Sequence, residues 1–389
     1  MPSSDSLDTL AILKTLVAFP TVSRDSNLAL IDWIEAYARR HGAAIRRTFN
    51  AEGTKGNILV SVGPPEVAGV MLSGHTDVVP VDGQDWATDP FDLTEKDGRL
   101  YGRGACDMKG FLAVALAWLP RFAAAKLKKP LHLAFSHDEE VGCLGVRSLV
   151  EDLAHLTALP EVCIVGEPTM MRPMLAHKGK VNVRVRVKGF ECHSSLAPTG
   201  VNAIEYAAEL IAFLKGMARR KSKDGPFDTM FDIAHTTIHT GLIEGGTALN
   251  IVPQDCTFDF EIRAIPVDDR MAILDEIKAY VAAELEPAMR AIHPSCGFSW
   301  EILSSVPGSD TDPNDPAVHM VSQLSGANSY GKVAFGTEAG RFQTRWNMST
   351  VICGPGDIDQ AHKPDEFVDV DQIRACEAFV GRLLERMRA

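Results

Sequence analysis

Four short, mostly apolar runs constrain most strongly how this chain can fold. They are residues 69–74, 131–136, 161–166 and 350–354, with the sequences GVMLSG, LHLAFS, EVCIVG and TVICG. Runs of this length are typical of strands that are buried on both faces of a parallel sheet. Segments with helical periodicity separate them. The pattern therefore predicts an α/β domain in which helices flank a mixed, mostly parallel sheet.

The pattern changes near residue 180. Residues 180–189, KVNVRVRVKG, alternate strictly between apolar and polar side chains, which favours an antiparallel strand with one exposed face. The elements that follow have the order βαββαβ together with this strand, and they predict a small α+β module. The α/β alternation then resumes. We therefore expect a discontinuous domain of residues 1–180 and 306–389, with residues 181–305 inserted into it.

Composition excludes several classes of protein. The net charge is -12 and no basic stripe offsets it, so nucleic acid is not an expected partner. The longest apolar run, residues 111–120, is far too short to cross a membrane. Eight cysteines occur without a CxxC pair, which favours reduced thiols and a cytoplasmic protein.

Side chains that bind metal ions follow each of the four apolar runs. In chain order they are His75 and Asp77; Asp138, Glu139 and Glu140; Glu167; and His362. One more carboxylate, Asp107, stands at the start of an apolar helix. Sites in open α/β sheets form outside the carboxyl ends of the strands, so we expect these groups to meet.

The residue types indicate which metal such a site would hold. Histidines mixed with carboxylates suit Zn²⁺, Co²⁺ or Mn²⁺ better than Ca²⁺. Their number fits two ions about 3.5–4 Å apart that share a bridging carboxylate. Any one of these acids, taken alone, is more often a helix cap or part of a solvated turn. The prediction depends on the presence of such groups after all four predicted strands.

Five motifs resemble those of a known family. SGHTDVVP, GRGACDMKG, HDEEVG, VGEPT and QAHKPDE are similar, in order and spacing, to motifs of the M20 family of dinuclear metallopeptidases and deacylases. The resemblance covers nearly the whole chain. It implies that His75, Asp107 and Glu167 bind one metal ion, and that Asp107, Glu140 and His362 bind the other. Asp107 would bridge the two ions, which are expected to be Zn²⁺, with Co²⁺ possible.

The resemblance also implies roles around the metal ions. Glu139 would be the general base for a metal-bridged water, and Asp77 would orient the ring of His75. A cis peptide bond is expected between Asp107 and Met108. Asp138 receives no role beyond a structural one.

Further roles fall on the inserted module and on a late loop. The resemblance implies that His193 donates a hydrogen bond to the oxyanion in a partner subunit's site, so that the module acts as a lid and holds a homodimer together. Arg263 and Asn250 would bind the substrate carboxylate. We add the hypothesis that Glu338, in FGTEAGRF, binds a distal ammonium of the substrate.

Within the family, the motifs are most similar to those of members that act on N2-acetyl-L-ornithine. The implied reaction releases L-ornithine and acetate, a step of arginine biosynthesis. The alternatives are hydrolysis of another acyl amino acid, such as N-succinyl-diaminopimelate, and hydrolysis of a dipeptide. A catalytically inactive binding protein is a further alternative, but it would be expected to lack a ligand or the base, and none is missing.

Overall fold

The computed structural model describes residues 8–388, and the chain divides into two compact units. Unit 1 spans Met1–Ala176, Ser309–Lys332 and Thr337–Ala389, and unit 2 spans His177–Gly308 and Val333–Gly336. Among the described residues, no helix is both long enough and apolar enough to cross a lipid bilayer.

The sheet of unit 1 has the strand order β1-β2-β6-β3-β7-β15-β8-β13, and β14 pairs with β8. Its strands are β1 (Ala44–Phe49), β2 (Gly56–Val62), β3 (Val70–His75), β6 (Leu131–Ser136), β7 (Val162–Pro168), β8 (Met174–His177), β13 (Ser309–Asp310), β14 (Gly331–Val333) and β15 (Ser349–Gly354). The central strands β6, β3, β7 and β15 are parallel, whereas β1, β2 and β8 pair in antiparallel fashion. The predicted mixed, mostly parallel sheet is confirmed.

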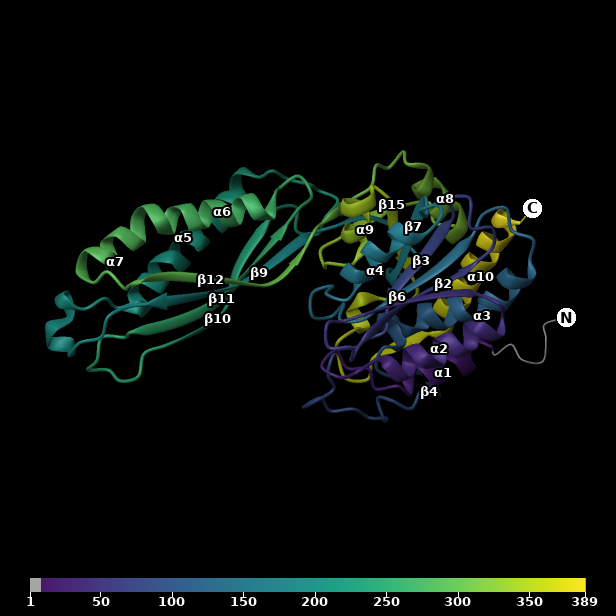
Figure 1. Cartoon of the computed structure of the whole chain (residues 1–389), viewed down its shortest axis with the longest axis horizontal. Helices are drawn as coiled ribbons and strands as arrows, with labels where there is room; N and C mark the ends of the chain where they lie inside the picture. Colours follow the sequence, from purple (N-terminus) through teal and green to yellow (C-terminus); the bar gives the residue numbers. More distant parts are fainter. Residues whose placement is uncertain (1–7, 389) are drawn as a thin grey trace. The chain divides into compact units, whose positions relative to one another are not determined.

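Helices flank this sheet (Figure 1). They are α1 (Thr9–Val17), α2 (Leu28–Arg40), α3 (Gly110–Ala124), α4 (Val146–Asp152), α8 (Pro316–Ser325), α9 (Ala339–Trp346) and α10 (Val370–Met387), with short turns η2 (Leu153–His155) and η5 (Ile358–Gln360). Helices α1, α2, α3, α8 and α10 share one apolar core with the sheet. Helix α4 packs against α9 and against strands β1, β2 and β6.

The segment before α3 departs from the expected helix. A continuous helix from residue 107 was predicted, but α3 begins only at Gly110. Asp107 and Met108, within η1 (Ala105–Lys109), have non-helical backbone angles, and the peptide bond between them is cis, as expected. A small three-stranded sheet is formed by β4 (Thr94–Lys96), β5 (Arg99–Tyr101) and β16 (Phe367–Asp369). Strands β4 and β5 precede this segment in the chain, and β16 follows it.

Unit 2 is a four-stranded antiparallel sheet with helices on one face (Figure 1). Its elements are β9 (Gly179–Lys188), η3 (Ser194–Thr199), α5 (Ala203–Asp224), β10 (Thr237–Gly245), β11 (Asp255–Ala264), α6 (Arg270–Tyr280), η4 (Val281–Leu285), α7 (Glu286–Ile292) and β12 (Gly297–Val306). The strand order is β10-β11-β9-β12. Alternate residues of β9 are buried beneath the helices.

Candidate metal centre

The parallel strands bring the expected ligands to one edge of the sheet. His75, the last residue of β3, pairs in register with Ser136, the last residue of β6. Glu167 lies near the end of β7, and His362 follows β15 after a short loop. Because parallel strands share the edge at which they end, segments far apart in the sequence meet there.

Asp107 lies between the two histidines. Its Oδ1 is 3.0 Å from Nε2 of His75, and its Oδ2 is 3.3 Å from Nε2 of His362. Glu140 Oε2 is 3.0 Å from the same nitrogen of His362, and Glu167 Oε1 is 4.0 Å from Nε2 of His75. One carboxylate therefore faces two separate groups of ligands, as a bridging ligand must.

These residues fit a metal centre. In each of two groups of residues, the ligand atoms all lie within 4.8 Å of one another. One group is His75, Glu139 and Glu167, and the other is His75, Asp107 and Glu140. Glu139, the expected base, is thus close enough to His75 and Glu167 to share a metal ion with them. Oε1 of Glu140 is buried without a hydrogen-bond partner, which is unfavourable for a carboxylate unless a cation contacts it. The site thus suits divalent cations that accept oxygen and imidazole ligands.

The electrostatics of the cluster also favour a cation. Burial, together with the charge of Glu140, raises the pKa of Glu139 to about 8, although His75 opposes the shift. Burial and the charge of Asp107 raise the pKa of Glu140 to about 7. Burial likewise raises the pKa of Glu167 well above its usual value. Without metal these carboxyls retain protons near neutral pH, and a divalent cation would take the place of those protons.

Asp77 contacts its neighbours differently from the expectation. Nδ1 of His75 lies 2.9 Å from the main-chain oxygen of Asp77, whereas the carboxylate oxygen is 3.7 Å away. The carboxylate instead accepts hydrogen bonds from the main-chain N–H groups of Glu139, at 3.1 Å, and Glu140, at 3.3 Å. It also accepts one from the Ser23 hydroxyl at 2.7 Å. Asp77 thus contacts the ring through its backbone, and its side chain holds the turn that carries the two glutamates.

Sequence reasoning missed a buried ion pair beside Asp107. Arg103 and Glu366 are each 1% exposed, and Nη1 of Arg103 donates to Oε2 of Glu366 at 2.6 Å. The other oxygen of Glu366 accepts from the main-chain N–H groups of Cys106, at 2.9 Å, and Asp107, at 3.0 Å. The pair therefore fixes the backbone that presents Asp107. The available signal was that Arg103 and Glu366 stand inside the motifs GRGACDMKG and QAHKPDE.

Glu338 is not the accessible acid that the ammonium hypothesis requires. It precedes α9, and it is only 1% exposed. Its two oxygens accept hydrogen bonds from the hydroxyls of Ser73 and Ser136, on β3 and β6. Burial raises its pKa. Since both oxygens accept hydrogen bonds inside unit 1, Glu338 is not available to bind a substrate ammonium.

The remaining candidate residues lie in unit 2. His193 is exposed at the start of η3, and its Nδ1 lies 2.8 Å from the Ser195 hydroxyl. Asn250 is also exposed, and its main-chain oxygen accepts from the N–H of Ser194 at 3.0 Å, so His193 and Asn250 are neighbours. Arg263, on β11, is partly buried and pairs with Glu261 at 2.8 Å.

Two further arginines of unit 2 lie on the exposed face of β9. Arg184 and Arg186 have side chains that are 36% and 50% exposed, and they form cross-strand ion pairs with Asp259 at 2.7 Å and Glu301 at 2.6 Å.

Comparison with known proteins identifies the family. The sequence profile of peptidase family M20/M25/M40 matches residues 71–386, which is most of the chain. The chain belongs to this family. A relative named acetylornithine deacetylase, from Shigella sonnei (strain Ss046), is 35% identical over 389 residues, covering 96% of each chain.

Solved structures share the fold, and one of them is described as an M20 family enzyme. The metallo-carboxypeptidase of Sulfolobus solfataricus superposes with a TM-score of 0.76 at 17% identity, covering 97% of this chain and 99% of that one. Aminopeptidase PepT of Bacillus cereus superposes with a TM-score of 0.75 at 18% identity, covering 97% and 98%. As a member of this family, the protein is a metal-dependent amidohydrolase.

Proposed function

We propose that this protein hydrolyses N2-acetyl-L-ornithine to L-ornithine and acetate, and so serves arginine biosynthesis. The observation that carries the proposal is the position of Asp107 between His75 and His362, with Glu139 beside them. The substrate is suggested by the 35% identity to a relative named acetylornithine deacetylase over nearly the full length of both chains.

The residues present would hold two divalent ions. We expect both to be Zn²⁺, with Co²⁺ as the alternative. His75, Asp107 and Glu167 would bind one, and Asp107, Glu140 and His362 the other. The ions would supply a Lewis acid for the amide carbonyl and make a water acidic at neutral pH. Glu139 takes a proton from that attacking water and returns it to the nitrogen of the leaving amine. The C–N bond breaks, acetate retains the water oxygen, and ornithine leaves as the free amine.

Substrate binding is assigned to unit 2. Arg263 and Asn250 would bind the α-carboxylate, because a guanidinium pairs with a carboxylate through two parallel hydrogen bonds. To do so, Arg263 must exchange or share its contact with Glu261. His193, which is exposed, would donate to the oxyanion in the site of a partner subunit.

We propose further that the protein is a cytoplasmic homodimer. Strand β10 is an edge strand of the unit 2 sheet, and its side chains Leu242 and Ile243 are 66% and 56% exposed. Leu249, on the loop that follows, is fully exposed. A second copy of the chain would cover these apolar side chains and the unpaired edge. The eight cysteines are all free, which agrees with a reducing compartment.

A substrate panel tests the proposal. Metal-loaded protein is assayed with N2-acetyl-L-ornithine, N-succinyl-diaminopimelate, neutral N-acetyl amino acids and dipeptides, and metal content is measured on the same sample. We expect the highest kcat/KM with acetylornithine and about two metal ions per chain. If kcat/KM is higher with the succinylated compound or with a dipeptide, that compound is the substrate and the acetylornithine proposal is wrong. Turnover that persists after complete chelation would contradict the metal assignment.

A further inference from the structure

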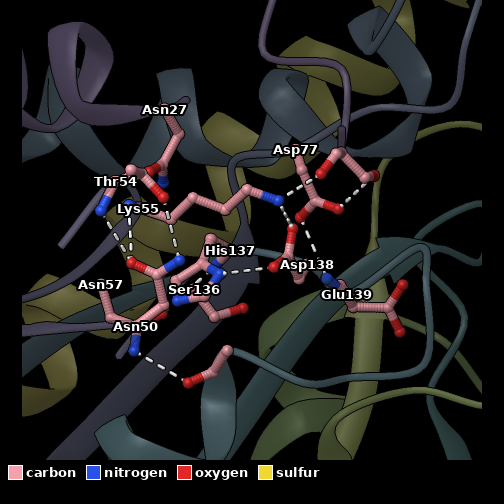
Figure 2. A network of polar contacts seen from close by, with 12 residues as sticks. Asn27, Asn50, Thr54, Lys55, Asn57, Asp77, Ser136, His137, Asp138 and Glu139 are labelled. Carbon is pink, nitrogen blue, oxygen red and sulfur yellow. Dashed lines mark hydrogen bonds and ion pairs between the residues drawn. The ribbon is translucent and has the colours of Figure 1, made fainter. Parts of the chain in front are cut away.

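Lys55 forms an ion pair directly beside the turn that carries Glu139 and Glu140. Its ammonium donates to Oδ1 of Asp138 at 2.6 Å and also to the main-chain oxygen of Ser23. The side chains of Lys55 and Asp138 are only 15% and 13% exposed. Figure 2 shows Lys55 reaching across to Asp138, with Asp77 and Glu139 beyond. A single ammonium thus connects three segments that are far apart in the sequence.

The backbone of Lys55 is held in place from its own side. Oδ1 of Asn50 accepts hydrogen bonds from the N–H groups of Thr54 and Lys55, both at 2.9 Å. The side-chain amide of Asn27 bonds to both the N–H and the carbonyl of Gly56, at 2.9 and 2.8 Å. The lysine is therefore presented from a fixed loop, and its ammonium has a defined position when it meets Asp138.

Asp138 has an uncommon backbone conformation. Its φ is 54°, a left-handed value that glycine, asparagine and aspartate adopt more readily than other residues. Glu139 and Glu140 follow directly, so this conformation sets the direction in which both leave the turn. The second carboxylate oxygen of Asp138 lies 3.1 Å from Nδ1 of His137. Removal of the ammonium would leave a largely buried carboxylate without its cation.

A second path from Lys55 reaches the same two glutamates. Ser23, whose carbonyl accepts from Lys55, donates its hydroxyl to Asp77. The Asp77 carboxylate then accepts the N–H groups of Glu139 and Glu140. Lys55 thus acts on the turn from two directions, once through the side chain of Asp138 and once through the backbone of the glutamates.

We propose that Lys55 and Asp138 are positioning residues. Through Asp138 and Ser23 the ammonium holds the turn so that Glu139 faces the attacking water and Glu140 faces the metal ions. This inference rests on the proposed function, in which Glu139 is the base and Glu140 a ligand. Neither Lys55 nor Asp138 is assigned a contact with substrate or metal.

The first test replaces the ammonium. Lys55→Met keeps a long side chain without charge, and Lys55→Arg keeps the charge. The matched control is Lys221→Met, because Lys221 forms a comparably buried pair with Asp268 at 2.8 Å in unit 2. We expect Lys55→Met to weaken Co²⁺ binding and to lower kcat, each roughly 10- to 100-fold, with KM little changed. Lys55→Arg should recover most of both losses, and Lys221→Met should show neither.

The second test separates the ion pair from the backbone conformation, and it decides the matter if Lys55→Met does not fold. Asp138→Asn tolerates the left-handed conformation and keeps an acceptor for Lys55. Asp138→Gly also tolerates the conformation but offers no acceptor. We expect the glycine variant to bind Co²⁺ at least about tenfold more weakly than the asparagine variant. Equal affinities would overturn the proposal, because the side-chain contact would then have no effect.

Metal binding is measured by competition with a chelator and by the visible spectrum of the Co²⁺ protein, neither of which needs turnover. If the wild-type protein binds metal but hydrolyses none of the panel, the proposed function fails while the positioning role can still be judged. If wild type is active and Lys55→Met retains its metal affinity and kcat, the positioning role alone is wrong.

Discussion

The thiol of Cys143 donates a hydrogen bond to the carboxylate of Glu139, with 3.0 Å between Sγ and Oε1. Burial, together with the charge of Glu139, raises the pKa of Cys143 well above its usual value, so the thiol keeps its proton and remains a donor. Cys143 is 2% exposed and lies four residues after Glu139, the proposed base. The contact involves Oε1, so Oε2 of Glu139 is the oxygen that we expect to accept the proton.

This contact should be measurable in turnover. Cys143→Ala removes the donor, and we expect kcat to fall roughly two- to fivefold, because a thiol is a weak donor and a net hydrogen bond contributes about 1 kcal/mol. Cys143→Ser restores a donor and should lie closer to wild type. Cys376→Ala, at an equally buried cysteine on α10, controls for the loss of packing. If alanine and serine at position 143 give the same kcat, the thiol contact does not affect Glu139.

The two adjacent glutamates should fail in different ways when each is changed. Glu139→Gln leaves the other ligands intact, so we expect about 10²- to 10⁴-fold lower kcat with both metal ions retained. Glu140→Gln removes a charged ligand and should lose metal as well as activity. Elemental analysis after dialysis, combined with steady-state kinetics, checks both. More than about a hundredth of wild-type turnover in Glu139→Gln would rule out its role as general base.

Metal removal should make stability depend on pH. Glu139, Glu140 and His362 have pKa values raised to about 8, 7 and 10, the last by hydrogen bonds to Asp107 and Glu140. The folded apoprotein therefore binds protons that the unfolded chain releases. Their stabilising effect is complete below the unfolded pKa values, about 4.5 for the glutamates and 6.5 for the histidine. It is lost progressively as the pH rises from those values through the folded ones, about 7 to 10. We expect the Tm of chelated protein to fall over this range more steeply than that of metal-loaded protein. Parallel curves in thermal unfolding would contradict this.

Glu338 should matter for the fold more than for substrate choice. Glu338→Gln exchanges one acceptor for a donor, so one of the two serine hydroxyls loses the carboxylate oxygen that accepts its hydrogen. We expect about 1–3 kcal/mol lower free energy of unfolding. The factor by which kcat/KM changes should be the same for acetylornithine and for a neutral N-acetyl amino acid. A rise in KM confined to acetylornithine would restore the ammonium hypothesis.

The shared-site dimer makes a complementation prediction. His193→Ala and Glu139→Ala should each be nearly inactive alone. In a hybrid dimer, the chain with intact Glu139 receives intact His193 from its partner, so one site of two is restored. Random re-association gives about half hybrids, hence roughly a quarter of wild-type activity. The variants are co-expressed with different tags, and hybrids are quantified. If the hybrids are inactive, His193 does not act in the partner's site and serves only its own chain.

The parallel core could be predicted because its strands are buried on both faces. Strand β6 was predicted at its observed bounds, and its six residues are all buried. Strand β1 was not predicted. Its sequence AIRRTF holds two arginines and no fully buried residue, so it shows no apolar run. Helix α9 was missed because it has only eight residues and half of its sequence, AGRFQTRW, is polar.

All of the candidate ligands except Asp107 could be located for the same reason as the core, since they follow buried strands. Asp107 stands just before a helix instead. The contacts that support these ligands could not be predicted. Arg103 and Glu366 are 263 positions apart, and Lys55 and Asp138 are 83 apart. No local pattern links such partners, because the fold alone brings them together. The Asp77 carboxylate shows the same limit: the family resemblance implied that it contacts the ring of His75, whereas it accepts hydrogen bonds from the turn after β6.

The order of the ligands along the chain has a consequence for biosynthesis. His75, Asp107, Glu140 and Glu167 precede unit 2, and His362 follows it, ahead only of β16 and α10. Helix α10 in turn belongs to the core beneath the sheet. The whole of unit 2 therefore has to be synthesised between the first four candidate ligands and the last one. We expect a nascent chain to complete the centre only after unit 2 and the following part of unit 1 have been made.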